Sequence, residues 1–391
     1  MYRTRTDRIK AERKQKRRRQ SWLMVLTGTL LGVFLLIAAY LNLPANPPNE
    51  ISQPGETDHP PQPIENGALP GSETQAGSVE PQVNLTFVGD VMMSGNVETM
   101  LKENGYDYPY AHVSSIFQRD DYTIANLETP VTKIGTPANK EYVYKSPPEA
   151  VPPLKASGVD LVNLANNHSM DQGVDGLLDT FKVLDANDVK YVGAGTDANR
   201  AYEPVLVERN GIKLAFLGFS RVVPEVSWYA GKNKPGLAVS YDPTRAIEAI
   251  RRAKEKADLV IVIAHWGKEK EDYPVDHQRD LARRYIDAGA DLIIGGHPHV
   301  LQGFEWYKNK WIAYSLGNFI FTRSSYAKTW ETMVLQATCT KQSCDLKMLP
   351  YRAELGRSVP MNEEDGRKLL ERVEAISTNV RIESDGTVKK P

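Results

Sequence analysis

Residues 259–267, LVIVIAHWG, and residues 292–300, LIIGGHPHV, are two apolar runs that each lead into glycine and histidine. Between them, residues 277–288 place Leu281 and Tyr285 four positions apart, as on one face of an amphipathic helix. An apolar run, a helix and a second apolar run form the strand–helix–strand unit of α/β proteins, whose parallel strands are buried on both faces. This stretch therefore predicts an α/β fold, with polar residues where such folds bind ligands.

The same alternation of short strands and amphipathic helices extends through the chain from about residue 83. Helices are expected at residues 174–187, 244–256 and 362–377, the last with Asn362 as its N-cap. The order of elements predicts a layered domain with a mixed sheet or two facing sheets. The expected strands are residues 84–88, 122–126, 161–164, 190–193, 204–207, 213–218, 259–264, 292–294, 310–314 and 332–336.

The segment ahead of this domain carries the signs of a membrane anchor. Residues 1–21 are basic, with ten Lys or Arg and two acidic residues among the first twenty. Residues 22–43 carry no charge, and a helix of that length spans about 33 Å, close to the roughly 30 Å hydrocarbon core of a bilayer. Because the cations precede the apolar run, we expect a single-pass cell-membrane anchor, a cytoplasmic N-terminus and an extracellular main domain.

A cleaved signal peptide is the competing interpretation of this segment. The apolar core of a signal peptide is usually about 7–15 residues long, whereas this run is longer and residues 38–40 (AAY) form a poor cleavage site. Residues 44–82 are rich in proline and nearly free of aliphatic side chains, so we expect a disordered linker there. The folded domain is then expected at residues 83–378, followed by a polar tail at residues 379–391.

Composition narrows the classes of function. The chain is 41% hydrophobic and 25% charged, which is typical of a globular protein. Its formal net charge is −1, but the first twenty residues contribute +8, which leaves −9 for the rest. A mildly acidic body lacks the basic surface that nucleic-acid binding requires, so nucleic acid is not an expected partner.

The two cysteines of the chain, Cys339 and Cys344, lie in a predicted hairpin. Its strands are residues 333–338 and 345–349, and four residues separate the thiols. This spacing suits a disulfide across the hairpin loop, which an oxidising compartment outside the cytoplasm would maintain. The alternative is a pair of free thiols in a reducing compartment.

Polar side chains follow five of the predicted strands. Each cluster alone could be a turn, a helix cap or a buried structural histidine. Together they supply the mixture of oxygen and nitrogen donors that divalent metal ions prefer, so they indicate a metal site. The clusters are Gly89-Asp90, Asn126-Leu127-Glu128, Asn166-Asn167-His168 with Asp171, His265-Trp266-Gly267, and Gly296-His297-Pro298-His299.

In this order, and with Tyr314-Ser-Leu-Gly-Asn318-Phe after them, these clusters resemble the CapA family of capsule and poly-γ-glutamate synthesis proteins. The resemblance covers roughly residues 83–325, and the anchor and spacer are similar to those of the family's membrane-bound members. The family in turn resembles the calcineurin-like metallophosphoesterases. The resemblance implies a four-layered α/β/β/α sandwich and a site for two divalent ions, such as Mn, Zn, Fe or Mg.

The resemblance also implies roles for individual residues. His168 would donate a proton to the leaving group, with Asp171 holding its ring. One departure concerns the phosphoesterase pattern Asp-x-His, which here ends in Met92, a poor ligand for hard cations. Substrate would contact Asn126, Asn166 and Asn318. The implied metal ligands are Asp90, a bridging Glu128, Asn167, His265, His297 and His299.

Two functions fit these expectations. The first is a metal-dependent hydrolase that acts outside the cell on a phosphoester or on an amide of an anionic polymer. The second is a non-catalytic subunit of a poly-γ-glutamate synthesis and export machine, in the membrane beside other subunits, which uses the site to bind polymer or partner. A role in capsule polymer production is favoured over an unrelated envelope hydrolase. The sequence contains no Gly-x-x-x-x-Gly-Lys-Ser/Thr loop, so ATP-driven ligation would need another subunit.

Overall fold

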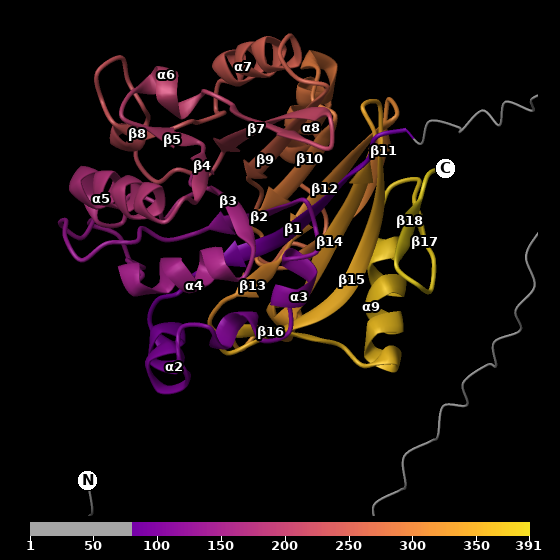
Figure 1. Ribbon diagram of the computed structural model, residues 1–391, viewed down its shortest axis with the longest axis horizontal. Helices are drawn as coiled ribbons and strands as arrows, with labels where there is room; N and C mark the ends of the chain where they lie inside the picture. The colour runs from indigo at the N-terminus through magenta and orange to yellow at the C-terminus, as the bar shows by residue number, and fades with distance from the viewer. Residues whose placement is uncertain (1–79) are drawn as a thin grey trace, which may run out of the picture. The chain divides into compact units, whose positions relative to one another are not determined.

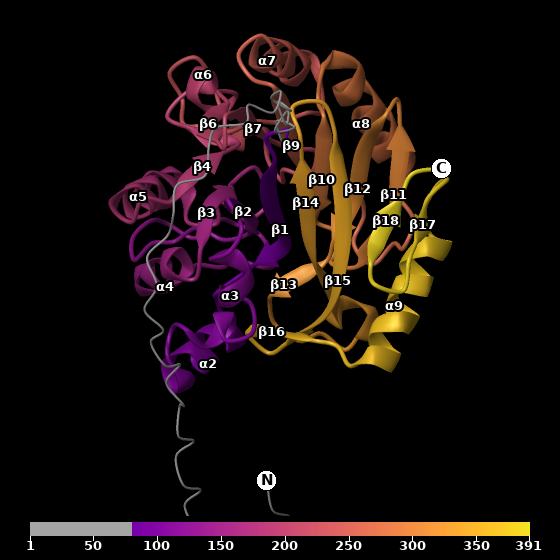
Figure 2. The same cartoon turned by 45° about the vertical axis from the view of Figure 1, so that its right-hand side comes forward.

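The structure is a computed structural model that describes residues 80–391, and two β-sheets that face each other lie at its centre (Figures 1 and 2). The first sheet is mixed: β1 to β4 are parallel, while β14 and β15 continue the sheet as antiparallel neighbours. Its order is β17 (Arg381–Ile382), β18 (Thr387–Lys389), β15 (Cys344–Glu354), β14 (Glu331–Cys339), β1 (Val83–Val91), β2 (Tyr122–Leu127), β3 (Val159–Asn163) and β4 (Lys190–Val192), with β13 (Asn318–Ile320) beside β1 and β16 (Arg357–Pro360) beside β15.

The second sheet has four parallel strands at its centre and an antiparallel strand at each edge. A separate two-stranded sheet pairs β5 (Ala194–Gly195) with β8 (Gly236–Leu237). The order of the second sheet is β11 (Leu301–Tyr307), β12 (Lys310–Leu316), β10 (Leu292–Gly296), β9 (Leu259–His265), β7 (Ile212–Ser220) and β6 (Val205–Arg209).

Three apolar cores fix the order of the layers as helix, sheet, sheet, helix. The middle core joins the two sheets, with Phe87 of β1 and Ile261 of β9 among its members. On the outer face of the second sheet, α7 (Thr244–Lys254) and α8 (Asp276–Ala288) cover β7, β9 and β10. The outer face of the first sheet is covered by α2 (Asn96–Asn104), α3 (Ser114–Phe117), α4 (Val151–Ala156) and α5 (Gly173–Ala186).

The mixed α/β fold expected from the sequence is confirmed. All ten expected strands are present, and most of them extend beyond the expected ends. The helix α9 (Glu363–Ala375) begins after Asn362, whose side chain accepts a hydrogen bond from the Asp365 amide, as expected of an N-cap. The strand β11 was not predicted, because it directly follows the His-Pro-His turn and has no polar boundary of its own. Buried Leu369 and Val373 of α9 extend the core between the sheets.

The last residues differ from the expected polar tail. Residues 381–389 form a small hairpin in which β18 pairs with β15, so the first sheet gains two strands. The physical reason is an Asp385-Gly386 turn, with Gly386 at φ 86°, followed by Val388, which is buried. An aspartate–glycine pair is a strong hairpin signal, and Val388 and Ile382 pack the hairpin against the core between the sheets.

The hairpin expected around the cysteines is formed by β14 and β15. Cys339 and Cys344 are opposite each other in register and are joined by a disulfide bond. Within residues 80–391, no helix has the length and apolar character needed to cross a bilayer. The expected basic tail at residues 1–21, the anchor at residues 22–43 and nearly all of the linker lie outside the described residues.

Candidate metal centre

The site lies where the carboxyl ends of strands from both sheets meet. Asp90 lies near the end of β1, and Glu128 directly follows β2. From the other sheet, His265 ends β9 and His297 follows β10. The His297 backbone amide donates to Asp90 Oδ2 across the sheets at 3.4 Å. Parallel strands therefore carry four of the expected ligands to one edge of the sandwich.

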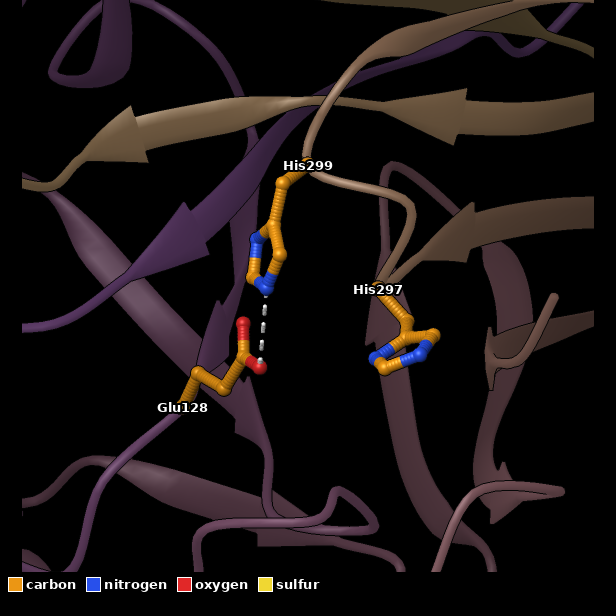
Figure 3. A group of neighbouring side chains, drawn as sticks. All are labelled: Glu128, His297 and His299. Atoms are coloured by element: carbon orange, nitrogen blue, oxygen red, sulfur yellow. Dashed lines mark ion pairs between the residues drawn. The ribbon is translucent and has the colours of Figure 1, made fainter. Parts of the chain in front are cut away.

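Glu128 is the centre of this cluster. Its side chain is fully buried, and neither carboxylate oxygen has a hydrogen-bond donor among the described residues. Oε1 lies 3.5 Å from His265 Nε2 and 3.9 Å from His299 Nε2. Figure 3 shows the rings of His297 and His299 projecting from one turn into the space beside the Glu128 carboxylate. A buried carboxylate without a donor is costly unless a cation completes it.

Two groups of potential metal-ligand atoms converge on this carboxylate. In each group the atoms lie within 4.8 Å of one another. Nδ1 of His297 has no hydrogen-bond partner in the described part of the chain, and the His297 ring lies 4.9 Å from that of His265. The groups are Glu128 with His297 and His299, and Asp90 with Glu128 and His265.

Asn167 joins the cluster from the first sheet. Its Oδ1 lies 2.8 Å from Nε2 of His265, so the amide and the imidazole face each other. All six expected metal ligands are thus gathered at one place. Their donor types suit a divalent cation, and several of their buried atoms have no hydrogen-bond partner within residues 80–391.

The electrostatics of the cluster also favour a bound cation. Burial and the nearby Asp90 carboxylate raise the pKa of Glu128 well above its usual range. Burial opposes protonation of His299, yet the carboxylates of Glu128 and Asp90 raise its pKa to about 10. Burial and the neighbouring His299 lower the pKa of His297 to about 3. A protonated His299 therefore places one positive charge beside the carboxylates of Glu128 and Asp90, and a divalent metal ion would place a larger positive charge there.

The histidine turn has an unusual backbone. His297 and His299 have φ values of 93° and 57°, a region that side chains other than glycine rarely adopt. The preceding Gly296 has no side chain, and a Cβ there would lie 2.8 Å from Asp90 Oδ1. Strain of this kind persists where the surrounding structure compensates for it, and it is common at functional sites.

The three asparagines that were expected to contact substrate also form hydrogen bonds within the protein. Asn126 Nδ2 donates to Asp90 Oδ1 at 2.7 Å, which orients that carboxylate. Asn318 Oδ1 lies 2.9 Å from Nδ1 of His299. Asn166 Oδ1 accepts from the backbone amide of His168 at 3.1 Å. These contacts indicate that the asparagines position the ligands and the loop that carries His168.

His168 and Asp171 form a pair beside the cluster. His168 Nδ1 lies 2.8 Å from Asp171 Oδ2, and burial lowers the pKa of His168. Lys140 lies on the other side of the carboxylate, with Nζ 2.5 Å from Asp171 Oδ1, and it donates to the backbone oxygen of Asn167 at 2.7 Å. The ring of Tyr144 packs on His168, with their centroids 4.9 Å apart.

Residues 84–323 match the family model described as bacterial capsule synthesis protein PGA_cap. The chain belongs to this family. The match begins in β1 and ends just after β13, so it includes all six expected metal ligands as well as the His168–Asp171 pair.

Two curated PGA_cap relatives come from Bacillus. The chain is 40% identical over 257 residues to the PGA biosynthesis protein CapA of Bacillus subtilis (strain 168). This alignment covers 65% of this chain and 67% of that protein. It is 38% identical over 263 residues to the capsule biosynthesis protein CapA of Bacillus anthracis. This alignment covers 65% of this chain and 63% of that protein. Among solved structures, the Haemophilus influenzae NAD nucleotidase NadN matches at a TM-score of 0.43 and 12% identity, over 76% of this chain and 63% of that chain.

Two features of this PGA_cap site were not foreseen from the sequence. Lys140 comes from a loop with no regular pattern, so nothing in the sequence marked its contact with Asp171. Asn163 donates from Nδ2 to Asn126 Oδ1 at 2.9 Å, and its place at the end of β3 was an available signal. Met92, the residue at which the sequence departs from the phosphoesterase pattern, is buried just after β1.

Proposed function

We propose that this protein is a membrane-anchored component of poly-γ-glutamate capsule synthesis or export, with an extracytoplasmic domain that acts as a metal-dependent hydrolase. Membership of the PGA_cap family and similarity to proteins named for PGA and capsule biosynthesis support the biological role. The anchor rests on the uncharged run at residues 22–43 and the basic residues before it.

The observation that carries the hydrolase proposal is the Glu128 carboxylate. It is fully buried, without a hydrogen-bond donor among the described residues, and two imidazoles and a second carboxylate surround it. A purely structural core would not place a carboxylate where its oxygens have no hydrogen-bond donor among the described residues, because removing a carboxylate from water costs several kcal/mol. Divalent ions held by Glu128 and His297 would provide partners for the atoms of these side chains that have no hydrogen-bond partner among the described residues.

In this proposal the ligands are Asp90, Glu128, Asn167, His265, His297 and His299. Divalent ions held there would acidify an attacking water molecule and neutralise charge on the attacked group. Asn126 fixes the direction of Asp90, and Asn318 fixes that of His299. The preformed orientation of the side chains reduces the cost of ordering them when a substrate binds.

The proton for the leaving group would come from Nε2 of His168. With a proton on Nδ1, the ring would donate to Asp171 Oδ2, and this contact would fix the ring and favour its protonated form against the burial that lowers the pKa of His168. Lys140 holds the second oxygen of Asp171 and prevents that carboxylate from rotating away. For hydrolysis of a γ-amide, water would add its hydroxide to the carbonyl carbon, the C–N bond would break, and the leaving nitrogen would take the proton from His168. The proton released by the water would return to His168 through solvent, which restores its protonated form.

One observation favours a second function, that of a non-catalytic subunit which binds polymer or a partner through this site. Met92 occupies the position at which related phosphoesterases carry a histidine ligand. A thioether binds hard cations poorly, so one of the two ions would be held less tightly. An unrelated envelope phosphoesterase remains the alternative if the purified protein cleaves phosphoesters but not polyglutamate.

The first experiment measures metal content per chain for the purified full chain and for Glu128→Gln. We expect up to two divalent ions per chain in the wild type and a loss of at least one in the variant. Because the change removes a buried charge without changing shape, the metal-free variant should melt no lower than the metal-free wild type. That control separates ligand loss from misfolding.

Metal-loaded protein is then incubated with poly-γ-glutamate and with simple phosphoesters. Release of new amino ends from the polymer would support the hydrolase proposal, and cleavage of phosphoesters alone would support the envelope phosphoesterase. Metal content no higher than that of Glu128→Gln would sink the metal-site proposal and favour the binding subunit.

A further inference from the structure

Lys140 lies where the proton-donor pair, a metal ligand and a loop of the second sheet meet. Its side chain is only 17% exposed, and its Nζ lies 2.5 Å from Asp171 Oδ1. The same ammonium lies 2.7 Å from the backbone oxygen of Asn167 and 3.1 Å from Nδ1 of His168. All three contacts are with one loop, residues 167–171, so a single cation fixes the ligand and the proton donor relative to each other.

A fourth neighbour of this ammonium comes from the other half of the sandwich. Trp228 ends the short helix η3 (Val226–Trp228), in the segment that follows β7, and its side chain is buried. Lys140 Nζ lies 5.3 Å from the centroid of the Trp228 ring, which is within the range of a cation–π contact. Lys140 itself lies between β2 and β3, so it links a loop of the first sheet with a loop of the second.

The arrangement suits a lysine and depends on its charge. An ammonium is a compact cation with three N–H donors, whereas a guanidinium is planar and forked. Asp171 is fully buried, and the Tyr144 backbone amide donates to its Oδ2 at 2.8 Å. Lys140 neutralises the carboxylate at its other oxygen, and this contact keeps the side chain turned toward His168. A displacement of a catalytic group by about 1 Å can cost about 100-fold in rate.

We infer that Lys140 and Trp228 are positioning residues for proton donation by His168: Lys140 holds the imidazole and its carboxylate partner beside the metal ligands, and Trp228 holds Lys140. The inference rests on the proposed function and assigns the alignment of the proton donor to a contact between the two sheets. It also separates two tasks of the site, the binding of metal and the donation of a proton.

Metal binding should not depend on Lys140. Asn166 Oδ1 accepts from the backbone amides of His168 and Ser169, so the loop keeps a second anchor when the lysine is removed. The side chain of Asn167 then remains at the metal centre. The expected signature is a loss of proton donation without a loss of metal.

The test uses two substrates that differ in how much their leaving groups need a proton. An alkyl phosphoester releases a strongly basic alkoxide, whereas p-nitrophenyl phosphate releases a weakly basic ion that needs little protonation. If the wild type cleaves only amides, a γ-glutamyl alkylamide and γ-glutamyl p-nitroanilide take their place. The metal content, kcat and KM are measured on the metal-loaded full chain for the wild type, Lys140→Met, Trp228→Leu and the double variant.

Lys254→Met is the matched control. Lys254 pairs with the buried Asp291 at 2.8 Å, and this pair lies ahead of β10, whereas the metal ligand His297 follows the same strand. Its replacement removes a lysine from a buried carboxylate away from the site. We expect this variant to melt at a lower temperature but to keep the wild-type kcat for both substrates.

We expect Lys140→Met to lower kcat for the alkyl substrate by about 10- to 100-fold and for the p-nitrophenyl substrate by less than about threefold, with KM and metal content close to wild type. Trp228→Leu should show the same pattern. The double variant should be no slower than Lys140→Met, because both residues act through one ammonium.

A chemical rescue keeps the test decisive if the single variants are unstable. Lys140→Cys alkylated with 2-bromoethylamine regains a lysine-like ammonium, and the native Cys339 and Cys344 are joined in a disulfide and do not compete. The alkylated protein should recover kcat for the alkyl substrate. Equal losses for the two substrates, loss of metal in Lys140→Met, or no recovery after alkylation would each overturn the inference. A wild type that cleaves neither substrate would overturn the proposed function and the inference with it, so the two failures are distinguishable.

Discussion

At the scale of single residues, the position of His168 separates its role from that of the metal ligands. Its neighbour Asn167 faces His265, whereas its own Nδ1 faces Asp171. Asn166 Oδ1 accepts from the backbone amides of both His168 and Ser169, so the loop is held by contacts that do not involve the imidazole. Truncation of His168 should therefore leave the ligands in place.

We predict that His168→Ala retains the metal content of the wild type but lowers the turnover rate by about 10²- to 10⁴-fold, the usual contribution of a general acid. Metal analysis and the rate of polymer or phosphoester cleavage, measured on the same sample, check this. His112→Ala, at an exposed histidine away from the cluster, is the control and should behave as wild type. Undiminished turnover in His168→Ala would remove this residue from the mechanism.

The sequence predicted which residues lie together at the site, but it did not predict the hydrogen bonds and ion pairs that some of them form there. Asp90, Glu128 and His265 were predictable because each lies at the end of an apolar strand, where parallel strands converge. The hydrogen bond from Asn126 to Asp90 was not predictable, because the same residue type at the same place also suits contact with substrate. Lys140 was missed because a loop without periodicity gives no indication of where its side chains go.

At the scale of elements, apolar runs flanked by glycine or polar residues were predictable, and elements without such boundaries were not. The strand β9 is buried along its whole length and reads as a strand from composition alone. The strand β11 continues directly from the histidine turn, and β18 has one buried side chain, so tertiary contacts decide both. The hairpin of β14 and β15 was predictable, since two alternating runs flank a short polar loop.

This hairpin leads to a prediction about its disulfide. We expect Cys339 and Cys344 to resist thiol labelling in the denatured, non-reduced protein, and both to react after reduction. The replacement of both by serine should lower the free energy of unfolding by about 2 kcal/mol, because the bond closes only a short loop. Denaturant unfolding of the variant and of reduced wild type should agree. Two reactive thiols without reductant would contradict the prediction.

At the scale of the whole molecule, charge is distributed unevenly along the chain. The first twenty residues carry +8 and precede an uncharged run, while the remainder carries −9. A cationic end is retained on the cytoplasmic side of a membrane, and an acidic body suits neither nucleic acid nor an anionic lipid surface. The same asymmetry makes local basic groups or metal ions necessary wherever a polyanion binds.

This asymmetry predicts a topology that can be measured in cells. We expect Lys232→Cys, at an exposed position of the folded domain, to react with a membrane-impermeant maleimide in intact cells. Asp7→Cys, in the basic tail, should react only after the membrane is permeabilised. The reverse pattern would place the domain in the cytoplasm and contradict the anchor orientation. A mature chain that has lost the Asp7→Cys site altogether would favour a cleaved signal peptide, because cleavage after the apolar run removes everything before it.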